Sequence, residues 1–267
     1  MRNWTLQCAS LSLEDKPKGL NKSHLIYGRH PVLEALKAGR MFEKILLQQG
    51  IASHEINEIR QLARTSQIPV QVVPPQKLKS VTTRNHQGVL GFLSLIQYYS
   101  VEDILLKTYD EGRTPLFLML DGITDVRNFG AIARTAELTG VDALIVPQKG
   151  GALISADAIK ASAGALSLIH VCKARELVEA ANYLRLNGIR LLAADERAEK
   201  KVFEVDFTIP SAIILGAEGA GISKDIMRKA EENFSIPMKG KIGSFNVSVS
   251  AGIVLYEVMR QRMLDNS

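Results

Sequence analysis

The sequence predicts an α/β protein in which a mostly parallel sheet follows a smaller unit of mixed helices and strands. From Leu116 onward, continuous apolar runs of strand length alternate with segments of helical periodicity, a pattern typical of parallel strands covered on both faces. A shorter series of strand and helix patterns fills residues 24–96. A chain of 267 residues is long enough for two such units, each with an apolar core.

The front of the chain divides into a tail and a small unit. Residues 1–23 are polar and charged with little apolar periodicity, so we expect a mobile tail that is not a signal sequence. In residues 24–96, Pro31 indicates a helix start and Pro74-Pro75 the end of a strand. The segments expected here are strands at 25–27, 44–48, 70–73 and 88–95, and helices at 31–38 and 53–66.

The rest of the chain is expected to hold a linker and a second domain. Residues 97–114 have the pattern of a linker with a short helical piece, and the second domain spans residues 115–267. Ser244 is expected as the N-cap of the last helix and Asn128 as the N-cap of the first. The strands are expected at 116–120, 143–146, 168–171, 189–193 and 212–215, and the earlier helices at 129–138, 156–165 and 176–186.

Composition and charge limit the class of protein. The hydrophobic share of 46% and charged share of 23% are those of a soluble globular protein, and no run approaches the ~20 apolar residues of a membrane span. The two cysteines form no Cys-x-x-Cys pair, so neither a disulfide framework nor a zinc site is indicated, and we expect a cytoplasmic protein. Residues 1–95 hold 13 Lys and Arg against 6 Asp and Glu, which fits either a nucleic-acid partner or an ordinary solvated basic surface.

Three polar patches follow predicted strands and are candidates for a site. The first holds Asn128 and Arg134, the second is a glycine-rich loop around Glu218, and the third is the stretch from Ser244 to Ser248. Open α/β sheets bind ligands beyond the carboxyl ends of their strands, so the patches could converge. Each also has a simpler interpretation: an exposed arginine, a flexible loop, or an ordinary capped helix. The loop has neither the G-x-G-x-x-G spacing of dinucleotide sites nor the Gly-Lys-Ser/Thr ending of a P-loop.

The three patches together resemble the motifs of a known family. The segments N-x-G-A-I-x-R-T-A, I-L-G-x-E-G-x-G-I-S and I-P-M-x-G-x-x-x-S-F-N-V-S-V-S-A, in this order, are similar to the motifs of the SpoU (TrmH-type) RNA ribose 2′-O-methyltransferases. The front unit resembles the small RNA-binding domain of the family's ribosomal-RNA members in its Y-G-R-H-P-V and N-H-Q-G-V segments. The resemblance implies a Rossmann-like sheet with a C-terminal trefoil knot, and a homodimer with its active site near the subunit interface.

The resemblance also implies the chemistry and the site residues. A methyl group would pass from S-adenosylmethionine to a ribose 2′-hydroxyl, with no metal. Arg134 matches the arginine proposed to handle the hydroxyl proton, although an almost always charged guanidinium could equally orient the hydroxyl and a phosphate. Glu218 could pair with Arg134 or orient a loop. The catalytic set implied is Arg134, Asn128, Glu218, Ser244 and Asn246. The cofactor-binding set implied is Leu215, Gly216, Glu218, Ile236, Met238, Phe245, Asn246 and Ser248; many relatives have Leu at the Phe245 position.

The substrate expected from the resemblance is RNA. Arg29 and His30, in a turn before a helix, and Arg84 and Asn85, before a strand, are candidate RNA contacts in the small unit. This separate unit favours large-subunit (23S) ribosomal RNA, with a guanosine ribose as target. A tRNA-modifying enzyme of the same chemistry and a non-catalytic RNA-binding protein on the same fold are the alternatives.

Overall fold

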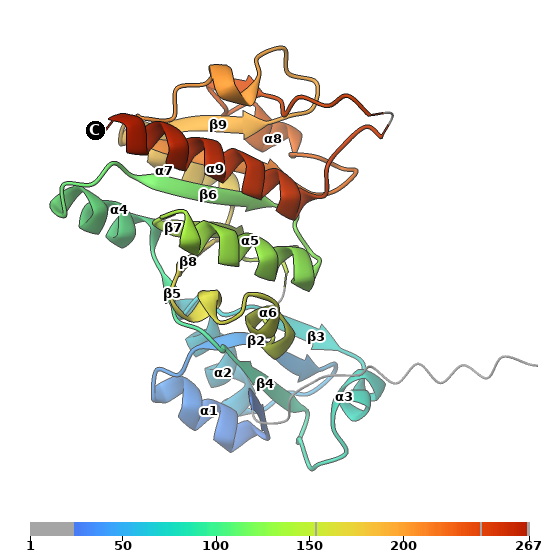
Figure 1. Cartoon of the computed structure of the whole chain (residues 1–267). Coiled ribbons are helices and arrows are strands. Elements are labelled where there is room, and N and C mark those ends of the chain that lie inside the picture. The colour runs from blue at the N-terminus through green and yellow to red at the C-terminus, as the bar shows by residue number, and fades with distance from the viewer. Residues whose placement is uncertain (1–23, 153, 241, 266–267) are drawn as a thin grey trace, which may run out of the picture.

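The computed structural model describes residues 24–152, 154–240 and 242–265, so the expected tail at 1–23 lies outside the described residues. Two sheets form separate units along the chain (Figure 1). The strands of the small sheet lie in the order β1 (Leu25–Tyr27), β4 (Val89–Leu93), β2 (Phe42–Gln48) and β3 (Val70–Val73). Within the described ranges, no helix combines the length and apolar character needed to cross a membrane.

The small unit has a core of its own. Its helices are α1 (Arg29–Lys37), α2 (His54–Thr65) and α3 (Pro75–Val81). Val32 of α1, Ile45 of β2 and Ile59 of α2 are fully buried together. α3 was not expected, because Pro74-Pro75 suggested only a strand end. Pro75 instead opens the helix at its first position, where a missing N–H costs nothing.

The large sheet has seven strands and two helical layers. Its strands lie in the order β11 (Glu232–Phe234), β9 (Arg190–Ala194), β10 (Ser211–Gly216), β6 (Leu116–Asp121), β7 (Ala143–Pro147), β8 (His170–Ala174) and β5 (Tyr98–Tyr99), and all their pairings are parallel. The predicted mostly parallel α/β fold is therefore confirmed. The strand β8 begins two residues later than expected, and α8 (Lys224–Met227) and a short 3-10 turn at Val202–Glu204 were not predicted.

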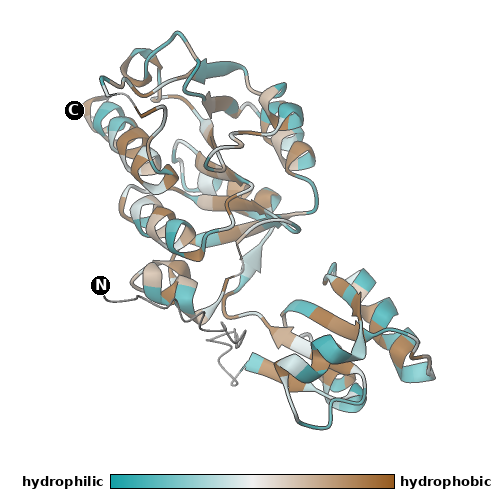
Figure 2. Ribbon diagram, turned by 90° about the vertical axis from the view of Figure 1, so that its right-hand side faces the viewer, coloured by the Kyte–Doolittle hydropathy of each residue, from teal (hydrophilic) through white to brown (hydrophobic). Residues whose placement is uncertain are grey.

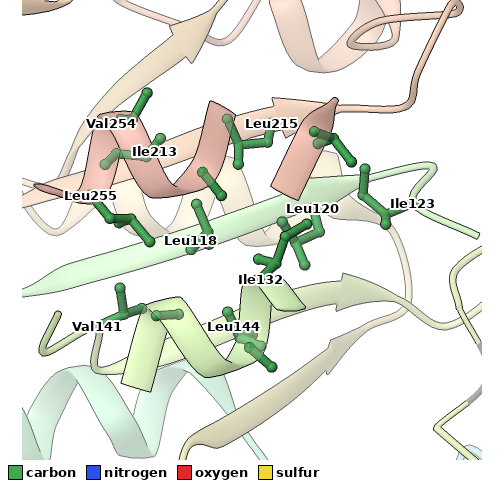
Figure 3. Close-up of a cluster of buried hydrophobic side chains, with 14 of the residues drawn as sticks. Leu118, Leu120, Ile123, Ile132, Val141, Leu144, Ile213, Leu215, Val254 and Leu255 are labelled. Carbon is green, nitrogen blue, oxygen red and sulfur yellow. The ribbon is translucent and has the colours of Figure 1, made fainter. Parts of the chain in front are cut away.

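Successive side chains of β6 point to opposite faces of the sheet and pack against the two helical layers in turn. Leu118 and Leu120 pack with α5 (Val126–Leu138) and α9 (Val247–Asp265), as Figure 3 shows, whereas Phe117 and Met119 pack with α4 (Val101–Asp110) and α7 (Leu177–Leu186). The helix expected at 156–165 ends early: α6 (Ala156–Ala161) stops before Ala163 and Gly164, which both have positive φ.

Residues 97–114 do not form a free linker. Tyr98 and Tyr99 are the edge strand of the large sheet, paired with β8, and Ser100 caps α4 by accepting a hydrogen bond from the Asp103 N–H at 3.0 Å. Ile104 and Leu105 of α4 are buried in the large core. A two-residue strand is too short to leave an apolar pattern in the sequence, which explains the difference from the expected linker.

The segment between β11 and α9 runs close to a loop formed earlier in the chain. Ser235 exchanges backbone hydrogen bonds with this loop, donating to the Lys200 carbonyl at 2.8 Å and accepting from the Val202 N–H at 2.9 Å. The chain then reaches the loop after β10, where Glu218 lies against Asn246. Such a course is compatible with a trefoil knot, and the knot itself stays a prediction.

Candidate active site

The structure brings one residue from each of the three sequence patches into a single hydrogen-bonded cluster. Asn128 follows β6, Glu218 follows β10, and Asn246 precedes α9, so all three lie at the carboxyl edge of the sheet. Asn128 Nδ2 donates to Glu218 Oε1 at 3.1 Å, and Asn246 Nδ2 donates to Asn128 Oδ1 at 3.1 Å. Asn246 Nδ2 also donates to Glu218 Oε1. We call these three residues the polar cluster.

The helix caps differ from those expected, and the difference frees Asn128. Asp125 caps α5: its Oδ1 accepts from the N–H groups of Arg127 at 2.7 Å and Asn128 at 3.0 Å. These bonds favour the charged carboxylate and hold the Asp125 pKa below its usual range. Because Asp125 caps the helix, the Asn128 side chain is available for Glu218 and Asn246.

The expectation that Ser244 caps the last helix is wrong. α9 begins at Val247, and Asn246 Oδ1 accepts a hydrogen bond from the Ser248 N–H at 2.9 Å, which is the N-cap interaction. Ser248 Oγ also donates to Asn246 Oδ1. Glu218 Oε1 accepts from the Val247 N–H at 3.3 Å, so the first turn of α9 holds a carboxylate, as a helix N-terminus favours.

A cavity of about 550 Å³ opens beside the polar cluster. Four stretches form its walls: the end of β9, the loop after β10, the helix α8, and the segment from the end of β11 to the first turn of α9. Most residues of the expected cofactor-binding set line it: Leu215, Gly216, Glu218, Ile236, Met238 and Phe245. Ser244, expected to be catalytic, also lines the cavity, whereas Asn246 and Ser248, which form the cap of α9, are not among its lining residues.

The end of β9 supplies lining residues that our sequence analysis missed. Asp195, Glu196 and Arg197 follow the strand directly and border the cavity. The signal was present, because polar residues after an apolar strand mark the same edge of the sheet as the other patches. These three residues were passed over because they do not belong to any of the three sequence motifs that contain the other patches.

The loop after β10 requires glycine at its start. A Cβ placed on Gly216 would lie 2.2 Å from the carbonyl carbon of Gly221, because the loop folds back on itself. Ala217 and Gly221 exchange backbone hydrogen bonds of 3.2 and 2.8 Å. Asp121 Oδ2 accepts from the Ser223 N–H at 2.7 Å and thereby ties the loop to β6. The loop is thus a fixed wall of the cavity.

Arg134 lies apart from the polar cluster of its own chain. It is exposed on α5, six residues or about 9 Å along the helix from Asn128 and on a different side. Glu218 contacts Asn128, Asn246 and the Val247 N–H, and in the described ranges no ion pair joins it to Arg134. The sequence left two roles open for Glu218: pairing with Arg134 or orienting a loop. Within a single chain, the hydrogen bonds of Glu218 correspond to the second role.

The candidate RNA contacts lie in the small unit around a second hollow of about 830 Å³. Arg29, Arg84 and Asn85 line it, while His30 is exposed nearby in the first turn of α1. Arg29 Nε donates to the Gln87 carbonyl at 3.1 Å, and Arg84 Nη1 donates to Tyr27 Oη at 2.6 Å. The lining also includes His86, from the same stretch as Arg84 and Asn85, and Lys79, which our sequence analysis did not select.

The site combines amides, hydroxyls, apolar walls and charged side chains of both signs, among them Glu218, Asp195 and Arg197. In the part of the chain that the structure describes, no group of three or more His, Cys, Asp and Glu side chains is placed to hold a metal ion. A mixed apolar and polar lining of this kind is typical of a pocket for a small organic ligand.

Comparison with known proteins places this geometry in a family. Residues 115–256 match the model of the SpoU rRNA Methylase family, and residues 25–99 match that of the RNA 2′-O ribose methyltransferase substrate-binding domain. A proposed TrmH family tRNA/rRNA methyltransferase of Staphylococcus saprophyticus is 34% identical over 238 residues, covering 89% of this chain and 96% of the relative.

Solved structures agree with these matches. The SpoU methyltransferase AviRb from Streptomyces viridochromogenes, in complex with AdoMet, is 25% identical with a TM-score of 0.58 and covers 90% of each chain. A TrmH/SpoU tRNA modifying enzyme of A. aeolicus is 29% identical with a TM-score of 0.53, covering 58% of this chain and 78% of the other. Both units, the three motifs and these likenesses lead to one conclusion: the chain belongs to the SpoU family of RNA methyltransferases.

Proposed function

We propose that this protein transfers a methyl group from S-adenosylmethionine to a ribose 2′-hydroxyl of RNA, with a guanosine of 23S ribosomal RNA as target. The observation that carries the proposal is the polar cluster beside the 550 Å³ cavity, in a member of an RNA methyltransferase family. The substrate class is supported by the small unit, which matches a substrate-binding model for RNA 2′-O ribose methyltransferases.

The cavity suits S-adenosylmethionine. Leu215, Ile236 and Phe245 offer apolar contacts for an adenine ring, and the backbone of the Gly216 loop offers polar groups at the same wall. When bound, the cofactor supplies a methyl group activated by its sulfonium. AviRb binds AdoMet in a chain that matches this one along 90% of its length, which supports the assignment.

The residues of this chain would mainly position the reactants. The Asn128, Glu218 and Asn246 side chains hold one another, so they present a rigid polar rim beside the cavity. Ser244 at the cavity wall offers a hydroxyl to the ribose. Arg134 would hold the phosphate and orient the 2′-hydroxyl as its proton leaves, and such orientation accounts for a large part of many rate enhancements.

We further propose that the protein is a homodimer and that α5 and α9 form its interface. Val249, Tyr256 and Met263 recur every seven residues along α9 and are all strongly exposed, so they form one apolar stripe. Leu138 of the adjacent α5 is 70% exposed, and Arg134 lies one turn before it. A second copy on this face would bury the stripe and bring Arg134 next to the partner, which would explain why Arg134 lies apart from its own cluster.

The direct test is transfer of a tritiated methyl group from S-adenosylmethionine to total RNA of a strain that lacks this gene, followed by nuclease digestion to locate the label. Label on a ribose of 23S ribosomal RNA is the expected result, and its site of action would then be the cytoplasm. Label on tRNA would keep the chemistry and change the substrate. No transfer, together with no cofactor binding by calorimetry, would favour the non-catalytic RNA-binding alternative.

A further inference from the structure

A small, mostly buried ion-pair cluster joins the two units. Tyr98 Oη donates to Glu43 Oε2 at 2.6 Å, and Lys173 Nζ donates to the same oxygen at 2.9 Å. Glu43 belongs to β2 of the small sheet, whereas Tyr98 and Lys173 belong to β5 and β8 of the large sheet. The Lys173 ammonium also lies 4.1 Å from the centre of the Tyr98 ring. One carboxylate of the small unit thus accepts two hydrogen bonds from the large unit.

The cluster is shielded from water. The side chains of Glu43 and Lys173 are only 9% and 18% exposed. Burial and the adjacent Glu43 raise the pKa of Tyr98, so its phenol remains a hydrogen-bond donor. Charged groups so placed are costly unless each keeps its partner, which makes the arrangement sensitive to the loss of any one group.

Few other directional contacts connect the units. Across the described ranges, the other hydrogen bond between residues 24–96 and the large unit runs from Gln148 Nε2 to the Gln67 carbonyl. Figure 2 shows the small unit as a separate body joined to the large unit by the connecting chain. Apolar contact is not directional, whereas charge-assisted hydrogen bonds restrict angle as well as distance. Glu43 is therefore the main directional contact between the two bodies.

We propose that Glu43, Tyr98 and Lys173 are positioning residues that set where RNA held by the small unit meets the cavity of the large unit. The proposal rests on the proposed function, because it takes Arg29 and Arg84 to contact the same RNA that is methylated. RNA that bridges two sites gains affinity only when their separation matches its own shape. If the cluster holds the two units in one orientation, the separation of the two RNA sites stays matched to the RNA. The cluster itself then needs no contact with the RNA.

The test compares a variant without the cluster with a matched control. Glu43→Gln combined with Lys173→Met removes both charges together, so that neither is left unpaired. Lys173→Arg keeps the charge and is the conservative variant. Glu58→Gln combined with Lys37→Met is the control, because this ion pair of 2.9 Å lies wholly within the small unit. Melting temperature and circular dichroism of each full-length protein establish that it is folded.

Two measurements are made on each protein. The first is the distance distribution between spin labels at Gln61→Cys and Leu186→Cys, two exposed positions on opposite units, in a Cys8→Ser background. The second is steady-state methyl transfer. In the cluster variant we expect a broader distribution and a KM for RNA raised at least tenfold, with less than twofold change in kcat and in the Kd for S-adenosylmethionine. Lys173→Arg and the control should resemble the wild type.

The outcomes separate this proposal from the proposed function. A distribution as narrow as that of the wild type, or an unchanged KM for RNA, would overturn the positioning role. Equal effects in the control pair would overturn it as well. If the wild-type protein transfers no methyl group to RNA, the proposed function fails together with the RNA part of this inference. The distance distributions then still decide whether the cluster holds the two units together.

Discussion

Glu218 illustrates how one side chain can organise three distant segments. Its Oε1 accepts hydrogen bonds from Asn128, from Asn246 and from the Val247 N–H at the start of α9. A carboxylate with this many donors on one oxygen is strongly oriented. Glu218 therefore holds the loop after β10 against the start of α9, and its place in the catalytic and cofactor-binding sets stays a prediction.

Replacement of Arg134 should lower the rate of methyl transfer and leave the folded structure unchanged. It is exposed, and its proposed task is to hold phosphate and ribose. Arg134→Ala should lower the rate of methyl transfer by about 100-fold or more, the scale of a lost proton-handling or orienting group, with cofactor affinity and dimerisation unchanged. Arg185→Ala, an exposed arginine on α7, is the matched control. Full activity in Arg134→Ala would remove it from the catalytic set.

The side chains of the site were easier to predict than their hydrogen bonds. Asn128, Glu218 and Asn246 could be selected because each follows or precedes an apolar segment within a dense polar motif. Their roles could not, because capping depends on where a helix begins to within one residue. Asp125 instead of Asn128, and Asn246 instead of Ser244, take the caps. Motif spacing alone does not contain that information.

At the level of elements, the loop after β10 depends on close approach of backbone to backbone. Gly216→Ala would place a methyl group against the Gly221 carbonyl carbon, so the loop must move. We expect an overpacking cost of about 1–3 kcal/mol in the free energy of unfolding and a marked loss of cofactor affinity, measured by thermal unfolding and calorimetry. Gly243→Ala is the control, since it lines the same cavity and its Cβ would meet no atom within 4 Å. Equal cofactor affinity in both variants would contradict the role given to the loop.

The helix α9 has two apolar faces with different tasks. Val247, Ala251, Val254 and Val258 are buried against the sheet, whereas Tyr256 is 61% exposed on the other side. Tyr256→Arg should therefore leave the fold intact and shift the protein to monomers, measured by sedimentation at equilibrium. Leu106→Arg, an equally exposed position on α4, should leave the association unchanged. A dimer that survives Tyr256→Arg would argue against this interface.

At the scale of the whole molecule, the sequence predicted the large elements well and the small ones poorly. Long buried strands such as β6 and β10 have continuous apolar centres, at residues 116–120 and 212–215, so their existence and parallel pairing could be inferred. The two-residue strand β5 and the four-residue helix α8 carry too few residues for periodicity to show. Only tertiary pairing identifies β5 as part of the large sheet, so residues 97–114, expected as a linker after the small unit ends at residue 96, pack with the large unit.

The division into two units predicts what a truncated protein would do. The large unit has its own buried cores on both faces of its sheet, and Ile96 packs against one of them. A chain that lacks residues 1–95 should therefore keep its fold, its cofactor affinity and its dimer. It would lose a segment with a net charge of +7 and the hollow around Arg29 and Arg84.

RNA binding by the truncated protein should weaken at least tenfold at low salt. The slope of log K against log salt concentration should also become shallower, because fewer phosphates are neutralised. Filter binding of 23S ribosomal RNA across a salt series measures both quantities, with the full-length protein as reference. Unchanged affinity and slope would show that the large unit alone holds the RNA, and would assign the small unit a task other than substrate binding.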